Sequence, residues 1–82
     1  MADFAQVVNA LATERAYQDD EYGTLPERNL SIGDYLVIAR GELEEAEQAF
    51  RDGSRADALC EMMQVAAVLV ACLERHGVGS RQ

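Results

Sequence analysis

Residues 42–64 read ELEEAEQAFRDGSRADALCEMMQ, and this stretch decides the fold. Apolar residues recur every three or four positions on both sides of Asp-Gly-Ser, which is typical of two amphipathic helices joined by a tight turn. Gly53 suits the left-handed position that ends a helix, and Ser54 followed by Asp57 has the capping-box pattern that opens the next one. So short a connection predicts two helices packed antiparallel as a hairpin.

The same signals, read outward from the hairpin, predict an all-α, three-helix protomer that forms one domain over residues 1–82. Ser31 and Asp34 form a second capping box, and Asp3 is a suitable N-cap for the first helix. Residues 21–30 contain Gly23 and Pro26 without a period, so we expect a loop there. The predicted helices cover about residues 3–20, 31–52 and 55–76, followed by a tail at 77–82.

The predicted faces indicate that the protomer does not work alone. Apolar residues of the second helix share one face and are expected in the core: Ile32, Tyr35, Leu36, Ala39, Leu43, Ala46 and Phe50. A comparable stripe on the third helix is expected to be core as well: Leu59, Met62, Ala66, Leu69, Val70 and Leu73. Because residues 65–73 (VAAVLVACL) are apolar on every side, we expect a homodimer or homotetramer, an oligomeric helical bundle, to bury them.

Four side chains stand in mirror-image positions about Gly53. Glu42 and Glu45 precede it by 11 and 8 residues, and Glu61 and Gln64 follow it by 8 and 11. In an antiparallel hairpin these positions meet at one level, and paired carboxylates on facing helices are how bundles build divalent metal sites. Oxygen ligands favour Mg²⁺ or Mn²⁺, which commonly also bind phosphate oxygens. The alternative is that these glutamates are ordinary solvated charges of helix surfaces.

The first helix changes character towards its end. Arg15 and Gln18 continue the stripe that Phe4, Val8 and Leu11 begin, so either the helix end emerges into solvent or these two polar side chains face a polar cavity. Tyr17 and Tyr22 flank the start of the loop and could stack on a ligand base, although tyrosines packed at a helix end are commoner.

Composition excludes some partners. The formal net charge is −8 and lysine is absent, which argues against direct nucleic-acid binding. We expect no membrane span, since no stretch approaches about 20 apolar residues, and MADFAQ lacks the features of a signal peptide. The expected location is the cytoplasm.

The pattern Glu42-x-x-Glu45, then Glu61-x-x-Gln64 and an apolar helix, resembles the MazG-like all-α nucleoside triphosphate pyrophosphohydrolases. Residues 14–23 also resemble the start of small MazG-related proteins that phages and mobile elements encode. The resemblance implies Mg²⁺ held by Glu42, Glu45 and Glu61, supported by Gln64. It further implies a nucleoside triphosphate substrate, with Arg15 suited to its phosphates and Gln18 to phosphate or base.

Two positions depart from the family pattern. Gly41 stands where the family has its first glutamate, and Gln64 stands where it has a final aspartate. An amide is a weaker Mg²⁺ ligand than a carboxylate, so metal binding and water activation should both be weaker. Two functions therefore stay open: Mg²⁺-dependent nucleotide binding with weak or restricted pyrophosphohydrolysis, or a catalytically inactive, acidic interaction protein that acts on a host partner. No catalytic residue is assigned.

Overall fold

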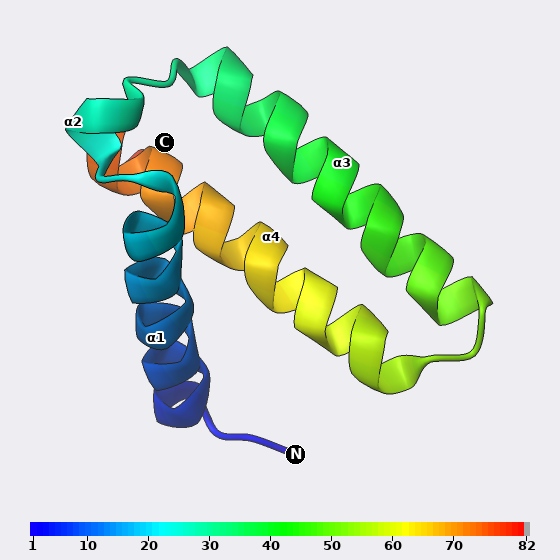
Figure 1. The fold of residues 1–82 in the computed structure, drawn as a ribbon. Coiled ribbons are helices and arrows are strands. Elements are labelled where there is room, and N and C mark those ends of the chain that lie inside the picture. The colour runs from blue at the N-terminus through cyan, green and yellow to red at the C-terminus, as the bar shows by residue number, and fades with distance from the viewer. Residues whose placement is uncertain (82) are drawn as a thin grey trace.

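The computed structural model describes residues 1–81, which are helical except for the termini and short connections. Figure 1 shows the resulting arrangement, with no strand in this range. The all-α prediction is confirmed, but residues 1–81 form four helices instead of the predicted three. They are α1 (Phe4–Tyr22), α2 (Leu25–Arg28), α3 (Ile32–Arg51) and α4 (Arg55–His76). Residues 77–81 of the predicted tail are not helical, and Gln82 lies outside the described residues.

The three long helices begin where their capping residues predict. The backbone N–H of Gln6 donates to Oδ1 of Asp3 at 2.8 Å, and the N–H of Asp34 donates to Oγ of Ser31 at 3.0 Å. At the start of α4 the N–H of Asp57 donates to Oγ of Ser54 at 3.3 Å. These bonds satisfy N–H groups that have no partner within the helix, so the helix starts are determined locally.

The short helix α2 corrects the prediction of an irregular loop at 21–30. Thr24 occupies its N-cap position, and the side chain of Glu27 accepts from the Thr24 backbone N–H at 3.1 Å and from its hydroxyl at 2.6 Å. Asn29 ends the helix in the left-handed conformation, with φ of 48°. The Thr-Leu-Pro-Glu sequence is itself a capping box with proline in the first turn, a signal that Gly23 and Pro26 obscured.

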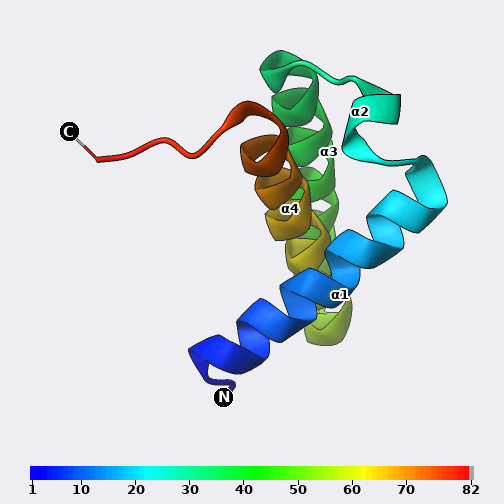
Figure 2. The ribbon, with the colours of Figure 1, turned by 90° about the vertical axis from the view of Figure 1, so that its left-hand side faces the viewer.

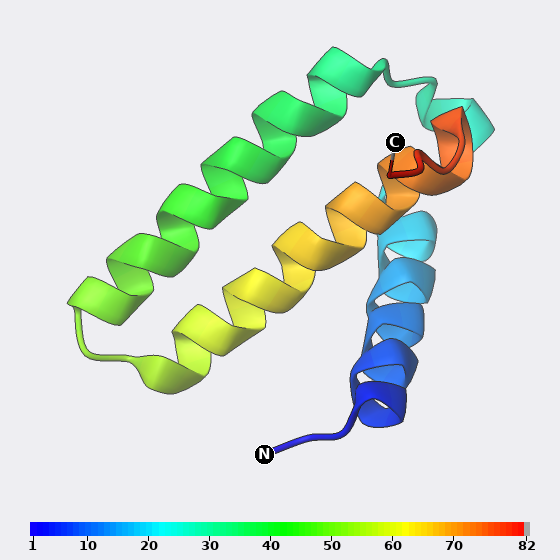
Figure 3. The same ribbon diagram turned by 180° about the vertical axis from the view of Figure 1, so that it is seen from behind.

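Helices α3 and α4 form the predicted antiparallel hairpin, as seen from both sides in Figures 1 and 3. Gly53 makes the turn with φ of 84°, and the N–H of Ser54 donates to the carbonyl of Ala49 at 3.0 Å. Helix α1 crosses α4 on a different side from α3, which Figure 2 shows. Helix α4 is therefore the central element, against which α1, α2 and α3 all pack.

The core of the chain is made mainly of small side chains, and this corrects the predicted core faces in part, since of their residues only Tyr35, Ala39 and Ala46 are buried. The buried apolar residues are Tyr35, Ala39, Ala46, Ala58, Ala67, Val68 and Ala71. Larger apolar residues of the predicted stripes are between 41% and 70% exposed: Ile32, Leu36, Leu43, Phe50, Leu59, Met62, Leu69 and Leu73. Alanines let two helices approach closely, so they form the contact within the chain, while the larger side chains remain on the outside of the hairpin.

Helix α4 is long and apolar enough to span a membrane by length and composition alone, with a mean hydropathy of 1.7 in its most apolar window. The sequence analysis expected no segment of this length and hydropathy, and α4 differs from that expectation. Core helices of soluble proteins meet the same criterion, so the cytoplasmic location stays a prediction.

Candidate functional site

Two glutamates lie in the seam between the hairpin helices. Glu42 of α3 is spaced between the buried Ala39 and Ala46, and Glu61 of α4 follows the buried Ala58 by three residues. Both side chains are partly buried, and the Oε2 atom of each is shielded from solvent without a hydrogen-bond partner in residues 1–81. A shielded carboxylate oxygen without a partner is costly, which singles these two residues out from ordinary surface glutamates.

The acids in this seam perturb one another. Burial raises the pKa of Glu42, and the charges of Glu45, Glu61 and Glu14 raise it further. Burial also raises the pKa of Glu61, with further contributions from the charge of Glu45, a hydrogen bond with Glu45 and the charge of Asp57. Burial and the neighbouring negative charges together favour the protonated form of each side chain. We call Glu14, Glu42, Glu45 and Glu61 the acid cluster.

The structure thus brings Glu42, Glu45 and Glu61 within electrostatic reach of one another, but it places Gln64 differently. The Gln64 side-chain amide lies 3.8 Å from Sγ of Cys60 on its own helix. Within residues 1–81, no three His, Cys, Asp or Glu side chains are already arranged to hold a metal ion. Metal ligation by Glu42, Glu45, Glu61 and Gln64 therefore stays a prediction.

Glu14 is a member of the cluster to which the sequence analysis assigned no role. It comes from α1, one helical turn before Gln18, so the two share a helix face. Glu14 could have been found from the placement of Gln18 on the buried side of α1. A residue four positions earlier on a helix projects from the same face.

Two hollows flank the acid cluster. One is open, about 390 Å³ in volume, and the side chains of Glu45, Asp57 and Glu61 contribute to its wall. The other, about 260 Å³, lies on the Glu42 side. We call the second one the inner cavity, and it is lined by Gln18, Tyr22, Arg28, Leu30, Ile38, Glu42 and Val68. Glu42 thus lines the smaller cavity, while Glu45 and Glu61 line the open hollow.

Arg15 and Gln18 are buried, at 6% and 4% exposure. The helix end therefore does not emerge into solvent. Gln18 lines the inner cavity, as the alternative of a cavity predicted, but Arg15 does not. The guanidinium of Arg15 is held by Glu74 at 2.7 Å and Asp19 at 3.0 Å. Burial by itself lowers the pKa of Arg15, but these two carboxylates outweigh it and raise the pKa overall. A phosphate that reached Arg15 would have to compete with both.

The remaining predicted ligand contacts divide between cavity and surface. Gln18 and Tyr22 line the inner cavity, while Tyr17 is 55% exposed and does not contribute to its lining. Sequence reasoning missed Arg28, whose side chain also lines the cavity. Its NH2 group lies 3.2 Å from Oδ1 of Asp19, and its Nε is buried without a partner in the described part of the chain. Arg28 lies within residues 21–30, which the sequence analysis interpreted as an irregular loop, and this explains why it was overlooked.

Comparison of the chain with protein-family models, with curated proteins and with solved structures finds no match.

Proposed function

We propose that this chain binds a nucleoside triphosphate together with Mg²⁺ or Mn²⁺, and that it releases pyrophosphate from it slowly or from a restricted set of substrates. The observation that carries the proposal is the pair of shielded, unpartnered oxygens on Glu42 and Glu61. Acceptor-only groups of like charge, held together between two helices, are stabilised by a hard divalent cation. The likeness to the MazG-like pattern points to the same residues.

Glu42, Glu45 and Glu61 would hold the metal, and Gln64 would support it once its amide turns away from Cys60. Bound Mg²⁺ would neutralise phosphate charge and make water a better nucleophile. The open hollow beside Glu45 and Glu61 offers the triphosphate a way to the cluster from the surface. Because Gln64 adds no charge, the acid cluster supports binding better than rapid turnover.

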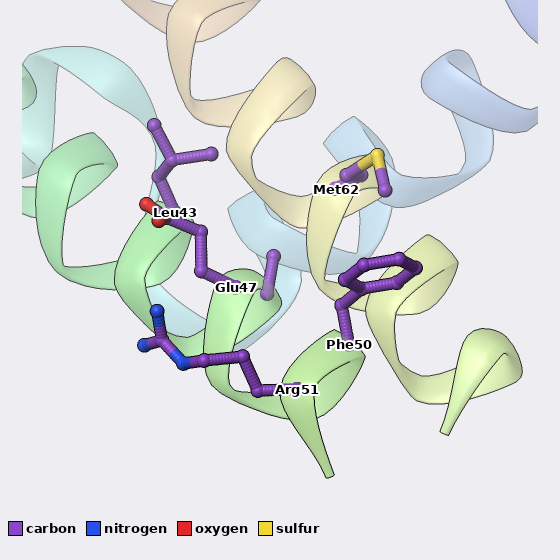
Figure 4. Close-up of a pocket in the computed structure, with 6 residues that line it drawn as sticks. Leu43, Glu47, Phe50, Arg51 and Met62 are labelled. Carbon is purple, nitrogen blue, oxygen red and sulfur yellow. The ribbon is translucent and has the colours of Figure 1, made fainter. Parts of the chain in front are cut away.

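We further propose that the working form is a homodimer or homotetramer. A groove of about 400 Å³ crosses the outside of the hairpin, and Figure 4 shows the Phe50 ring of α3 beside Met62 of α4 in it. Phe50 is 70% exposed and Met62 is 47% exposed. Exposed apolar residues contiguous over two helices mark a protein interface. A second hairpin packed on this face would complete an oligomeric bundle.

The thermal unfolding midpoint tests ligand binding. Mg²⁺ plus a nucleoside triphosphate, tried across the common ribo- and deoxynucleotides, should raise the midpoint, because a ligand that binds only the folded state stabilises it. Glu45→Ala should abolish the shift. Glu44→Ala, which removes an exposed charge from the neighbouring position, is the matched control and should retain it. No shift with any nucleotide would overturn the proposal. Pyrophosphate release, measured in parallel, separates turnover from binding.

Gln64→Asp provides a second measurement. A carboxylate added beside the three predicted metal ligands Glu42, Glu45 and Glu61 should tighten Mn²⁺ binding about tenfold or more, since one added charge at close range contributes about 1–4 kcal/mol. Asn9→Asp introduces the same charge on the exposed surface of α1 and should change Mn²⁺ binding little. Equal Mn²⁺ affinity of both variants and the parent chain would mean that the glutamates are surface charges only.

The alternative proposal is an acidic interaction protein that acts on a host partner without catalysis. Within residues 1–81, no three His, Cys, Asp or Glu side chains are positioned to hold a metal ion, which favours this alternative. The net charge of −8 also favours it, because an acidic surface attracts a basic partner. A basic host protein recovered with the chain, equally well with and without Mg²⁺ and nucleotide, would support this function over nucleotide binding.

A further inference from the structure

The connection between α1 and α3 forms part of the wall of the inner cavity. We call residues 23–31 the strap, and it contains α2. Arg28 and Leu30 of the strap line the cavity, and the remaining lining residues belong to α1, α3 and α4. A movement of the strap alone would therefore change the shape of the cavity while the long helices stay in place.

Left-handed backbone positions lie at both ends of α2. Gly23 precedes the helix with φ of 93°, and Asn29 follows it with φ of 48°. At a residue other than glycine, this conformation persists only where neighbouring contacts hold it. Helix α2 is also too short to be stable by itself. The conformation of the strap therefore depends on its contacts with the rest of the chain.

The last turn of α4 holds the end of the strap that leads into α3. NH2 of Arg75 donates to Oδ1 of Asn29 at 3.2 Å, and Nε2 of His76 lies 2.8 Å from the Leu30 carbonyl oxygen. A carbonyl oxygen only accepts, so Nε2 of His76 is the donor. We call Arg75 and His76 the latch, and Figures 1 and 3 show this end of α4 beside α2. Both bonds are exposed, so water competes for them and each contributes modestly.

The closed strap leaves polar groups without partners. Nε of Arg28 and the hydroxyl of Tyr35 are shielded from solvent and have no hydrogen-bond partner in residues 1–81. Tyr35 belongs to the core cluster against which Leu25 and Leu30 of the strap pack. Shielded polar groups without partners are costly, and water satisfies them once they are exposed. The closed form is therefore favoured by burial of the two leucines and by the latch, and opposed by desolvation of these polar groups.

We propose that the strap opens as a unit while the hairpin stays folded, and that the latch controls access of small molecules to the inner cavity from the α2 side. The volume of about 260 Å³ belongs to the closed form. Opening removes the wall that Arg28 and Leu30 provide, so the cavity widens towards solvent. This inference goes beyond the proposed function, and its test uses neither metal nor nucleotide, so either can fail without the other.

The test begins with amide hydrogen exchange, followed by NMR in EDTA without nucleotide. The N–H groups of Arg28 and Asn29 make the hydrogen bonds of α2, at 3.0 Å each. Opening breaks both bonds, so the protection factors of these amides should be about tenfold or more lower than those of Ala46 and Ala67 in the hairpin. Equal protection of all four amides would mean that the strap opens only when the whole chain unfolds, and would overturn the inference.

His76→Phe tests the latch, because phenylalanine keeps a ring beside Tyr35 but cannot donate to Leu30. The ring centroids of Tyr35 and His76 lie 6.1 Å apart. Loss of one exposed bond should speed exchange of the strap amides about three- to tenfold. Val78→Phe adds the same ring at a residue that is 86% exposed, so it is the matched control and should leave the exchange unchanged. Equal exchange in His76→Phe and the parent chain would contradict the latch.

Ala58→Gly separates opening of the strap from unfolding of the chain. Ala58 is 1% exposed and lies near the start of α4, at the opposite end of that helix from the latch. Because the hairpin stays folded in the open form, this substitution should speed exchange of Ala46 and Ala67 about tenfold and leave the strap amides unchanged. Equal acceleration of the strap amides would mean that the strap has no opening of its own, and would overturn the inference.

Thiol labelling tests whether the opening reaches the cavity. Val68 lines the cavity and is 7% exposed, so Val68→Cys places a shielded thiol there. In a background of Cys60→Ser and Cys72→Ser, its rate of reaction with dithiodipyridine should rise in His76→Phe by the same factor as exchange of the strap amides. Ala58→Gly should not change this rate. A labelling rate that does not respond to His76→Phe would show that the strap does not cover the cavity, and would refute the proposed control of access.

Discussion

The guanidinium Nε of Arg15 on α1 lies 2.7 Å from Oε1 of Glu74 on α4. The two residues are 59 positions apart in sequence, and their contact joins the two helices. The Arg15 side chain is 8% exposed and that of Glu74 is 50% exposed. The contact therefore has one buried and one solvated partner. Burying an arginine requires compensation by opposite charge, and Glu74 provides it from the helix against which α1 packs.

Glu74→Gln should destabilise the chain. The buried guanidinium would keep only Asp19 as a carboxylate partner, at a cost of about 1–3 kcal/mol. For a domain of this size, each kcal/mol lowers the unfolding midpoint by about 4–8 °C. Thermal unfolding followed by circular dichroism measures the change. Glu47→Gln, a charge removal on exposed α3 surface, is the control, and an equal midpoint in both variants would show that the ion pair does not anchor α1.

Glu42→Gln should stabilise the metal-free chain at neutral pH. Burial, with the charges of Glu45, Glu61 and Glu14, raises the native pKa of Glu42 above its unfolded value of about 4.3. Between the unfolded and the native pKa of Glu42, the native state holds more protons than the unfolded chain. The free energy of unfolding therefore falls as the pH rises from the first of these values through the second. Glu42→Gln removes this loss of stability, because glutamine stays neutral at every pH. After allowance for solvent screening of a partly exposed group, we expect a gain of about 0.5–1 kcal/mol at pH 7.

Unfolding curves from pH 3.5 to 8 in EDTA measure this effect. The difference between Glu42→Gln and the parent chain should vanish at the acidic end, where both side chains are neutral. Added Mg²⁺ should then stabilise the parent chain more than the variant. Glu44→Gln controls for the loss of one negative charge. A variant less stable than the parent chain at pH 7 would mean that Glu42 has a favourable partner.

Phe50→Glu should weaken self-association. Burial of one phenylalanine contributes about 1.5–3 kcal/mol, so its loss should raise the dissociation constant about ten- to a hundredfold. Light scattering after size exclusion, at several concentrations, measures the mass. Val78→Glu changes an apolar residue that is 86% exposed and outside the helices, so it should not alter the mass. A parent chain that is monomeric at every concentration would refute the proposed oligomer.

Two glycine substitutions should have opposite effects. Gly53 has φ of 84° and no heavy atom within 4 Å of an added Cβ, so Gly53→Ala should cost about 1 kcal/mol through backbone strain alone. Gly41 lies inside α3, also with free space, so Gly41→Ala should stabilise the chain by about 0.5–1 kcal/mol. Chemical denaturation measures both. Stabilisation by Gly53→Ala would mean that the hairpin turn does not require the left-handed conformation.

The local features of the fold could be predicted from sequence because their causes are local. Ser31, Ser54 and Gly53 act on backbone groups within a few residues, so the capped helices and the hairpin follow from them. Helix α2 was missed because a four-residue helix has no periodicity to detect. Its capping box between Thr24 and Glu27 was the available signal.

The candidate site could be predicted only in part. The mirror symmetry about Gly53 pointed to Glu42, Glu45 and Glu61, whose charges act on one another in the structure, but their role as metal ligands stays a prediction. Glu14 and Arg28 joined the site through the packing of α1 and α2, which no spacing within the hairpin determines. The arginine was overlooked for that reason, although it lines the inner cavity.

The sequence by itself determined the helical class, the helix starts and the antiparallel hairpin, since capping and turn formation depend on neighbouring residues. Only the tertiary structure decided which apolar face lies inside the chain. Both α3 and α4 are apolar over a wide arc, and the small side chains Ala39, Ala46 and Ala58 were buried, while Phe50 and Met62 stayed outside. Periodicity locates an apolar face, but how closely two helices approach depends on side-chain size, and this placed Glu42 and Glu61 in the seam.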